Sequence, residues 1–346
     1  IMAYTTIDDP SAHFNTVLYS GTGSENAITG VGFQPDWIWL KDRTQTYSHG
    51  LFDSSRGANK KLNSNNTNAE QTPTEELKSF DSDGFTLGTA NGVNQSSDNF
   101  VAWNWKANGG TTSSNSDGSI TSTVQANTTA GFSIVTYTGN STNGATVGHG
   151  LTQKPEMYWV KNREDSTKNW GVYNESIGAT KWLKLNLTDA SADDVIWANT
   201  APTSSVFYLN STLTANDNGD DIVAYCFHSI KGYSKIGKYT GNGASSDGPF
   251  VYTGFKPAFF LIKSIGAARN WHILDNKRNT VNPVNLYLNP NNTDADGTFV
   301  FGDFVSNGFK IRNNGNTFNN NGEDYIYMAF AEHPFVSSKG VPTTAR

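Results

Sequence analysis

Neighbouring carboxylates are the first residues in this sequence that could do chemistry. They occur at four places: Asp81 and Asp83, Asp193 and Asp194, Asp220 and Asp221, and Glu323 and Asp324. Glycoside hydrolysis needs two carboxyl groups that face each other across a cleft. Most of these pairs lie in turns rich in Gly, Asn and Ser or flank expected strands, where solvated turn residues explain them equally well. We therefore expect no enzyme and no catalytic residue, with a polysaccharide depolymerase as a minor alternative.

Other catalytic and metal-binding patterns are missing from the sequence. No G-x-S-x-G elbow occurs, and none of the six histidines shows the H-x-H, H-x-x-x-H or H-E-x-x-H spacing of a zinc site. Three loops rich in oxygen ligands could hold calcium: "DSDG" (81–84), "NDNGDD" (216–221) and "NNTDADG" (291–297). None continues into an EF-hand pattern. We expect no cofactor, with calcium at one of these loops as the alternative.

The elements that would position such residues come from an internal repeat. "PDWIWLKDR" has counterparts in "PEMYWVKNR" and "PAFFLIKSI", so that Pro35, Pro155 and Pro257 align, as do Lys41, Lys161 and Lys263. The match extends upstream to "YSG", "YTG" and "YTG" and downstream to the closing segments "FVAWNWKA", "IVAYCFHS" and "YIYMAFAE". Three units over about residues 14–107, 130–231 and 236–335 follow from a repeat of this kind.

Each unit contains about six short strand-like runs separated by Gly, Asn and Asp, without a helical period. This pattern predicts an all-β fold of three tandem antiparallel β-sandwich, jelly-roll-like modules. The run that follows each proline is apolar on both faces, which predicts a central strand covered on both sides. We expect the lysine at the end of that strand to be solvated.

The expected domain boundaries follow from the repeat. Residues 1–107 form the first module with an N-terminal arm, residues 131–231 the second, and residues 232–346 the third with a C-terminal tail. Between the first two lies a segment rich in Gly, Ser, Thr and Asn, residues 108–130, which we expect to be a linker.

Aromatic side chains offer a different kind of site, because a sugar ring can stack on an exposed aromatic ring. Trp170, Trp182 and Trp271 are the candidates for a glycan-binding platform, with Trp197 as a further exposed-Trp candidate. Trp170 and Trp271 recur at one repeat position, where the first unit has His49. Such recurrence favours a core position that needs a large side chain, and the platform stays the alternative.

Composition excludes some classes of function. The net charge of −6 and the absence of a run of Lys and Arg argue against nucleic-acid binding. No stretch approaches the length of a membrane span, and we expect no membrane insertion and no signal peptide. The single cysteine, Cys226, lies in an apolar strand-like run, where a buried core residue is the expectation.

The unit resembles a repeated β-module found in proteins of marine tailed bacteriophages. The resemblance rests on "GFQPDWIWLKDR", "HGLFDSSRG", "FDSDGFTLG" and "VAWNWKA", and on "AGFSIVTYTGN", "YSKIGKYTGNG" and "PFVSSKGVPTTAR" in later units. It covers essentially the whole chain. Proteins of this kind are described as phage structural or tail-associated proteins of undetermined biochemical role, so the resemblance implies no functional residue.

What the resemblance implies is a virion structural protein on a tail, a fibre or a projection from the particle surface. Its partners would be other virion proteins and a host surface glycan, and its location the extracellular particle after assembly in the host cytoplasm. A homo-oligomer is expected, with a trimer favoured by analogy with phage fibres. A glycan-binding adhesin is the alternative from another functional class.

Overall fold

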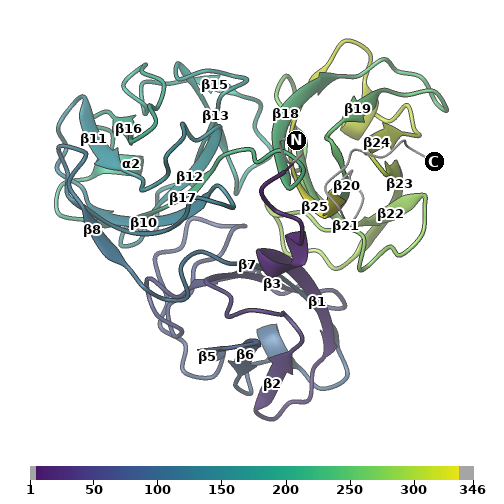
Figure 1. The fold of residues 1–346 in the computed structure, drawn as a ribbon, viewed down its shortest axis with the longest axis horizontal. Helices are drawn as coiled ribbons and strands as arrows, with labels where there is room; N and C mark the ends of the chain where they lie inside the picture. The colour runs from purple at the N-terminus through teal and green to yellow at the C-terminus, as the bar shows by residue number, and fades with distance from the viewer. Residues whose placement is uncertain (1–4, 335–346) are drawn as a thin grey trace.

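The computed structural model describes residues 5–334 of the chain, and these form three lobes arranged around a common centre (Figure 1). Each lobe is a sandwich of an inner sheet, which faces the centre, and an outer sheet. All pairings between the named strands are antiparallel. The predicted all-β class with antiparallel sandwich modules is confirmed. None of the helices that the structure describes is long and apolar enough to cross a membrane.

Module 1 (residues 14–107) follows a short 3-10 helix, η1 (Pro10–Ala12). Its inner sheet has the order β1 (Phe14–Ser20), β7 (Asn99–Trp105), β3 (Trp37–Asp42) and β4 (Gly50–Asp53). Its outer sheet has the order β2 (Asn26–Thr29), β6 (Gly84–Leu87) and β5 (Leu77–Asp81). A single helical turn, α1 (Asn91–Asn94), precedes the closing strand β7.

Module 2 (residues 113–231) has the largest sheet. Its order is β15 (Ala192–Asp193), β14 (Lys181–Lys184), β13 (Gly171–Asn174), β12 (Met157–Asn162), β17 (Asp221–Phe227), β10 (Phe132–Thr138), β9 (Ser122–Asn127) and β8 (Ser113–Asn115). The outer layer is the pair β11 (Ala145–Gly148) and β16 (Val206–Leu209), followed by α2 (Leu213–Asn216).

Module 3 (residues 234–334) repeats the plan of module 1. Its inner sheet has the order β18 (Ser234–Thr240), β25 (Asp324–Pro334), β20 (Phe255–Ser264) and β21 (His272–Asp275). Its outer sheet has the order β19 (Phe250–Tyr252), β24 (Gly308–Ile311), β23 (Gly297–Val305) and β22 (Val284–Tyr287), and α3 (Asn316–Asn319) is its helical turn.

The prediction of a linker over residues 108–130 is wrong where the strands β8 and β9 form within it. β9 pairs with β10, and β8 pairs with β9, so the segment extends the sheet of module 2. Its Ser- and Thr-rich composition suggested a linker, but β-branched residues also favour strands. Pairing satisfies the backbone groups of β10, and Val124 and Gln125 of β9 are buried.

The post-proline strands lie where the sequence predicted them, between two neighbours in each inner sheet. In β3, Trp37 and Trp39 point into a core at the centre of the molecule, whereas Ile38 and Leu40 point into the core of module 1 itself. A strand buried on both faces needs continuous apolar residues. This double burial explains the unbroken run "WIWL".

The central core is shared by all three modules. Trp37 of module 1 lies 4.6 Å from the ring centroid of Tyr225 in module 2, and Trp105 lies 5.4 Å from that of Phe259 in module 3. Modules 2 and 3 meet where Phe227 lies 6.4 Å from Phe330. Burial of large aromatic side chains is among the strongest contributions to stability. The three modules therefore share one hydrophobic core and are not independently packed domains.

One buried asparagine in each helical turn holds the loop after the "YSG" or "YTG" motif. Asn94 accepts a hydrogen bond from the backbone N–H of Thr22 and donates to the carbonyls of Ser24 and Gly88. Equivalent bonds surround Asn216 and Asn319. A buried amide with its hydrogen bonds satisfied fixes a loop without a regular element.

Candidate functional site

The three tryptophans predicted as a glycan platform are buried. Trp170 and Trp271 are fully buried, and Trp182 is 8% exposed with the Lys184 ammonium over its ring. Trp197 is also fully buried. A sugar cannot stack on a ring whose faces are covered by protein, so these residues form no platform. The predicted core position of Cys226 is confirmed, and burial raises the pKa of its thiol.

Trp170 and Trp271 instead join neighbouring modules. The indole Nε1–H of Trp170 donates to the carbonyl of Asn63 in module 1 at 2.8 Å, and that of Trp271 donates to the carbonyl of Lys184 in module 2 at 2.9 Å. Buried indoles usually find such an acceptor. Each bond runs from one module to the preceding one.

His49 closes this ring of hydrogen bonds from module 1 to module 3. Its Nδ1 lies 2.8 Å from Nε1 of Trp39, which can only donate, so Nδ1 is the acceptor. Nε2 then carries the hydrogen and donates to the carbonyl of Asn289 at 3.0 Å. Burial holds the pKa of His49 well below its usual value, so the ring is neutral.

A second ring of backbone hydrogen bonds joins the same three pairs of modules, with donors and acceptors in the opposite direction. The N–H of Glu70 donates to Arg163, that of Ser191 to Ile265, and that of Asp296 to Arg43, each to the carbonyl. The three donors each lie five residues after an asparagine, namely Asn65, Asn186 and Asn291. These asparagines therefore occupy the same position in the three modules. Each of these asparagines accepts a hydrogen bond from the N–H of His49, Trp170 or Trp271. Aligning the similar segments "KKLN" (60–63) and "LKLN" (183–186) by their last residues would pair Asn63 with Asn186, two residues away from the match with Asn65 that these bonds show.

The repeated lysines are buried, which corrects the prediction of solvated strand ends. Lys41 and Lys161 are fully buried and Lys263 is 1% exposed. Each ammonium donates to the carbonyls one and four residues later, for example from Lys41 to Asp42 at 2.5 Å and to Gln45 at 3.0 Å. Burial lowers the pKa of each of the three lysines to about 8. The lysine thus fastens the turn that ends the central strand.

The interface between modules 1 and 2 contains a buried ionic cluster. Arg56 lies 2.5 Å from Asp53 and 2.9 Å from Glu70, and its side chain is fully buried. The hydroxyl of Tyr225 in module 2 donates to Asp53 at 2.7 Å, and Arg163 lies 2.8 Å from Glu70. Burial acts to lower the pKa of Arg56, but Asp53 and Glu70 more than offset this, so its pKa is raised.

The interface between modules 3 and 1 repeats that cluster. Arg278 lies 2.6 Å from Asp275 and 2.8 Å from Asp296, again with a fully buried side chain. From module 1, Trp103 donates to Asp275 at 3.1 Å and Arg43 lies 2.8 Å from Asp296. The carboxylates here, like those of the first interface, are occupied by arginines and cannot act as free acids or bases.

The loops considered for calcium use their carboxylates internally. Asp83 accepts hydrogen bonds from the N–H groups of Gly30 and Gly32, and Asp81 accepts them from the hydroxyls of Ser79 and Thr86. Within residues 5–334, no group of three or more His, Cys, Asp or Glu side chains is arranged to hold a metal ion. The described carboxylates of these loops thus act in turns and ion pairs.

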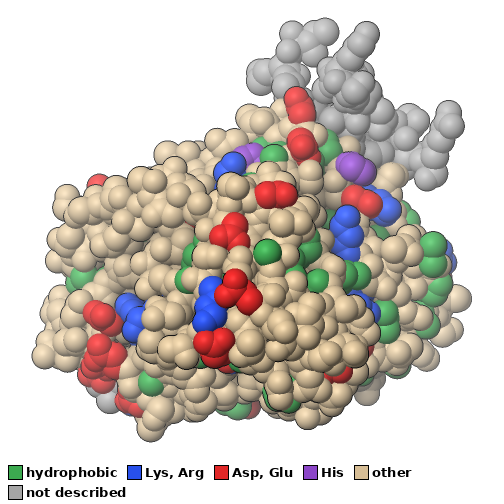
Figure 2. Space-filling model, turned by 90° about the horizontal axis from the view of Figure 1, so that it is seen from below, with side chains coloured by type: hydrophobic (Ala, Val, Ile, Leu, Met, Phe, Trp, Pro, Cys, Tyr) green, Lys and Arg blue, Asp and Glu red, His purple; other side chains and the backbone are tan. Residues whose placement is uncertain are grey.

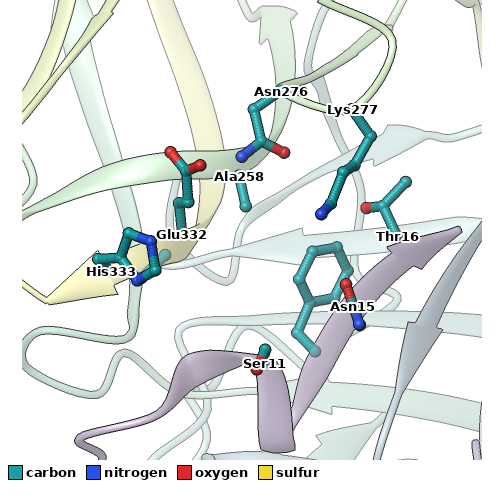
Figure 3. Close-up of a pocket in the computed structure, with 10 residues that line it drawn as sticks. Ser11, Asn15, Thr16, Ala258, Asn276, Lys277, Glu332 and His333 are labelled. Carbon is teal, nitrogen blue, oxygen red and sulfur yellow. The ribbon is translucent and has the colours of Figure 1, made fainter. Parts of the chain in front are cut away.

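A cavity of about 300 Å³ lies between modules 3 and 1, at the rim of the shared core (Figure 3). Polar side chains dominate its lining: Ser11, Asn15, Thr16, Asn276, Lys277, Glu332 and His333. Figure 3 shows the Lys277 ammonium directed into the space between Asn276 and Thr16. Within residues 5–334, Oγ1 of Thr16 and Oδ1 of Asn276 are buried without a hydrogen-bond partner. Thr16 is 4% exposed.

The repeat explains why the cavity occurs at this interface. Ala258 occupies the position of Asp36 in module 1 and of Glu156 in module 2, as the repeat offsets of 120 and 102 residues require. Asp36 accepts hydrogen bonds from three backbone N–H groups, and Glu156 accepts one from that of Ser229. Ala258 leaves that volume empty.

A second substitution enlarges the space. Thr16 pairs with Trp103 in the way that Ile134 pairs with Tyr225 and Ile236 with Met328. The two isoleucines are buried and contribute to the shared core. Because threonine is smaller and polar, it provides a hydroxyl where the other interfaces have apolar side chains.

Comparison with known proteins gives a family but no activity. Residues 9–334 match the family described as a domain of unknown function, DUF7483. The chain belongs to this family. No curated protein and no solved structure matches it. The function of this DUF7483 domain must therefore be argued from its own residues.

The DUF7483 domain also carries an exposed aromatic pair that the sequence analysis did not single out. Phe250 and Tyr252 on β19 are 48% and 54% exposed and point to one side of the outer sheet of module 3. Lys310 is paired with Asp247, and Arg312 with Asp303, on the same sheet. The strand pairing assigns Ala27 and Thr29 in module 1 to the same positions. Comparing these paired positions shows that module 1 has no aromatic residue where module 3 has Phe250 and Tyr252. The strand pairing is therefore the signal that could have identified the aromatic pair.

Proposed function

We propose that this protein is a structural component of a bacteriophage particle, placed on the tail, a fibre or a surface projection, with no catalytic role. The observation that supports it most is the use of its reactive side chains. His49 and the arginine–carboxylate clusters join the modules at buried interfaces, and the repeated buried lysines fasten the turns at the ends of the central strands. Side chains used in this way make the molecule rigid, as a structural component of a particle requires. The sequence resemblance to phage structural proteins supports the location.

One face of the molecule fits this proposal. Figure 2 shows charged side chains of both signs scattered among uncharged polar surface, with no large patch of either sign. A surface of this kind favours solubility and contacts with other proteins through shape and hydrogen bonds over attraction to a polyanion.

Antibody labelling of intact particles tests the proposal. An antibody raised against the purified chain should label particles in electron micrographs at the tail or fibres. Label on capsid vertices would overturn the tail placement and keep the structural role. If particles carry no label, and mass spectrometry of purified particles finds no peptide of this chain, the proposal fails.

We further propose that copies of the chain assemble with one another, a trimer being the favoured state by analogy with phage fibres. Light scattering coupled to size-exclusion chromatography should give about three times the chain mass of 37.6 kDa. A monomer mass at high protein concentration would contradict this assembly.

A glycan-binding role is a second candidate, favoured by the exposed pair Phe250 and Tyr252. Because the flanking Lys310–Asp247 and Arg312–Asp303 pairs neutralise each other, this surface suits a neutral polysaccharide. Affinity electrophoresis in gels containing dextran or laminarin should show retardation. The double variant Phe250→Ala/Tyr252→Thr, which carries the residues of module 1, should migrate freely.

Val281→Ala is the matched control, since Val281 is 74% exposed at another surface position. Equal migration of the wild type in gels with and without polysaccharide would count against this second candidate.

A further inference from the structure

We propose that the cavity between modules 3 and 1 binds a small hydroxylated carboxylic acid, about the size of one sugar acid. The cavity volume of about 300 Å³ lies at the lower end of the range for ligand pockets. Its residues come from two modules, with Thr16 from β1 and Asn276 and Lys277 from the loop after β21. The other two interfaces fill the corresponding space with their own side chains.

The buried polar atoms define the ligand's hydroxyl groups. Oδ1 of Asn276 can only accept, so it needs a donor from the ligand. Oγ1 of Thr16 can donate or accept, and it lies buried on the opposite side of the cavity. A buried polar atom without a partner costs about 1–3 kcal/mol. A hydroxylated ligand offers both donors and acceptors and would satisfy both atoms.

The charges define the ligand's carboxylate. Glu332 lies 2.6 Å from Lys256, so its charge is compensated within module 3. Among the described residues, Lys277 forms no ion pair, and its ammonium is directed into the cavity. The cavity therefore presents one uncompensated positive charge. An anionic group on the ligand would complement it.

The repeat supports the same assignment. In modules 1 and 2 the equivalent volume holds the carboxylates of Asp36 and Glu156, each accepting hydrogen bonds. Ala258 removes that carboxylate from module 3. A ligand carboxylate near Lys277 would restore an acid to a position that the fold fills with one in its two other copies.

Isothermal titration of the full chain with glucuronate, glucose and acetate tests the proposal. Glucuronate should bind, and both glucose, which lacks the carboxylate, and acetate, which lacks the hydroxyls, should bind at least about tenfold more weakly. Lys277→Gln should weaken glucuronate binding by about tenfold or more, because a hydrogen bond to a charged group is lost. Lys231→Gln, a change outside this cavity, should leave it unchanged.

A filled cavity provides the sharpest variant. Thr16→Ile/Ala258→Glu introduces the side chains that module 2 has at these positions, and it should abolish glucuronate binding while the chain still unfolds cooperatively. Acetate or glucose binding as tightly as glucuronate would overturn the proposed ligand class. Glucuronate binding that survives in the filled variant, or no glucuronate binding to the wild type, would overturn the site itself.

Discussion

Among the described residues, the interface between modules 1 and 2 and that between modules 3 and 1 contain ion pairs, whereas the interface between modules 2 and 3 contains none. The interfaces between modules 1 and 2 and between modules 3 and 1 each bury an arginine between two carboxylates. At the corresponding positions between modules 2 and 3 lie Asn174, Ile177 and Ser191. Ile177 packs against the shared core, and Ser191 bonds to the carbonyl of Ile265.

The partner across the interface changes together with the cluster. Tyr225 and Trp103 donate to Asp53 and Asp275, whereas the residue at the same position of module 3 is Met328, which offers no donor. A buried carboxylate without its arginine would be costly. These residues are present or replaced together, on inner-sheet strands whose order is the same in all three modules.

The largest expected effect comes from breaking one ionic cluster. Arg56→Met removes the arginine from the buried carboxylate of Asp53, whereas Glu70 keeps Arg163, and it should lower the free energy of unfolding by about 3–5 kcal/mol. Urea unfolding followed by tryptophan fluorescence measures this. Ile177→Met, at the same position of module 2, is the matched control and should cost less than about 1.5 kcal/mol. Similar losses in the two variants would contradict the comparison.

A smaller effect is expected from the indole hydrogen bonds of modules 2 and 3, whose place His49 takes in module 1. Trp271→Phe keeps most of the buried ring but leaves the carbonyl of Lys184 without its donor, which should cost about 1–3 kcal/mol. Trp170→Phe should cost a similar amount, although it lies at an ionic interface. Unfolding free energies that differ by more than this range would show that the indole bonds and the ionic clusters are coupled.

Replacing the whole ionic cluster between modules 1 and 2 by the neutral residues of the interface between modules 2 and 3 should lower stability less than removing Arg56 alone. The variant Asp53→Asn/Arg56→Ile/Glu70→Ser/Arg163→Ile/Tyr225→Met gives the first interface the residues of the third. Replacement of a whole buried ionic cluster by packed neutral residues is often neutral or stabilising. We therefore expect this variant to unfold at a higher urea concentration than Arg56→Met. An additional loss relative to Arg56→Met would refute the view that the cluster acts as a unit.

The smallest effect is a pH dependence common to all three modules. The buried lysines have pKa values of about 8, below their usual value of 10.5. Between these values the unfolded chain binds more protons, so their contribution to stability grows as pH rises and is lost as pH falls through about 8. Lys161→Met should flatten the rise in urea midpoint between about pH 8 and pH 10. Lys154→Met, at an exposed position, should leave that slope unchanged.

The sequence was sufficient to predict the repeat, the all-β class and the central post-proline strands, because bulky apolar residues at fixed spacing state these directly. It was not sufficient for the burial of Lys41, since a lysine after an apolar run usually reaches solvent, and its carbonyl ligands exist only once the following turn has formed. The composition of residues 108–130 likewise concealed β9, whose pairing partner β10 lies after it in the chain.

The candidate site was visible in the sequence only as a difference between copies. Aligned positions gave Asp36, Glu156 and Ala258, but the meaning of the alanine depended on where the inner sheets meet. For Trp170 and Trp271 the sequence favoured the core position that the structure shows, but it left the platform open for the same reason. Their rings are buried by the neighbouring module, and no pattern within one unit describes a contact between units.

Hydrogen exchange of the Arg56→Met variant, compared with the wild type, tests the central claim that the three modules form one cooperative body. The backbone amides of β3, β12 and β20 are the probes, one strand from each module. If the core is shared, all three strands should lose protection by the same free energy, although Arg56 does not lie in module 3. Loss of protection in β3 and β12 with β20 unchanged would show that the modules unfold independently and would contradict the account.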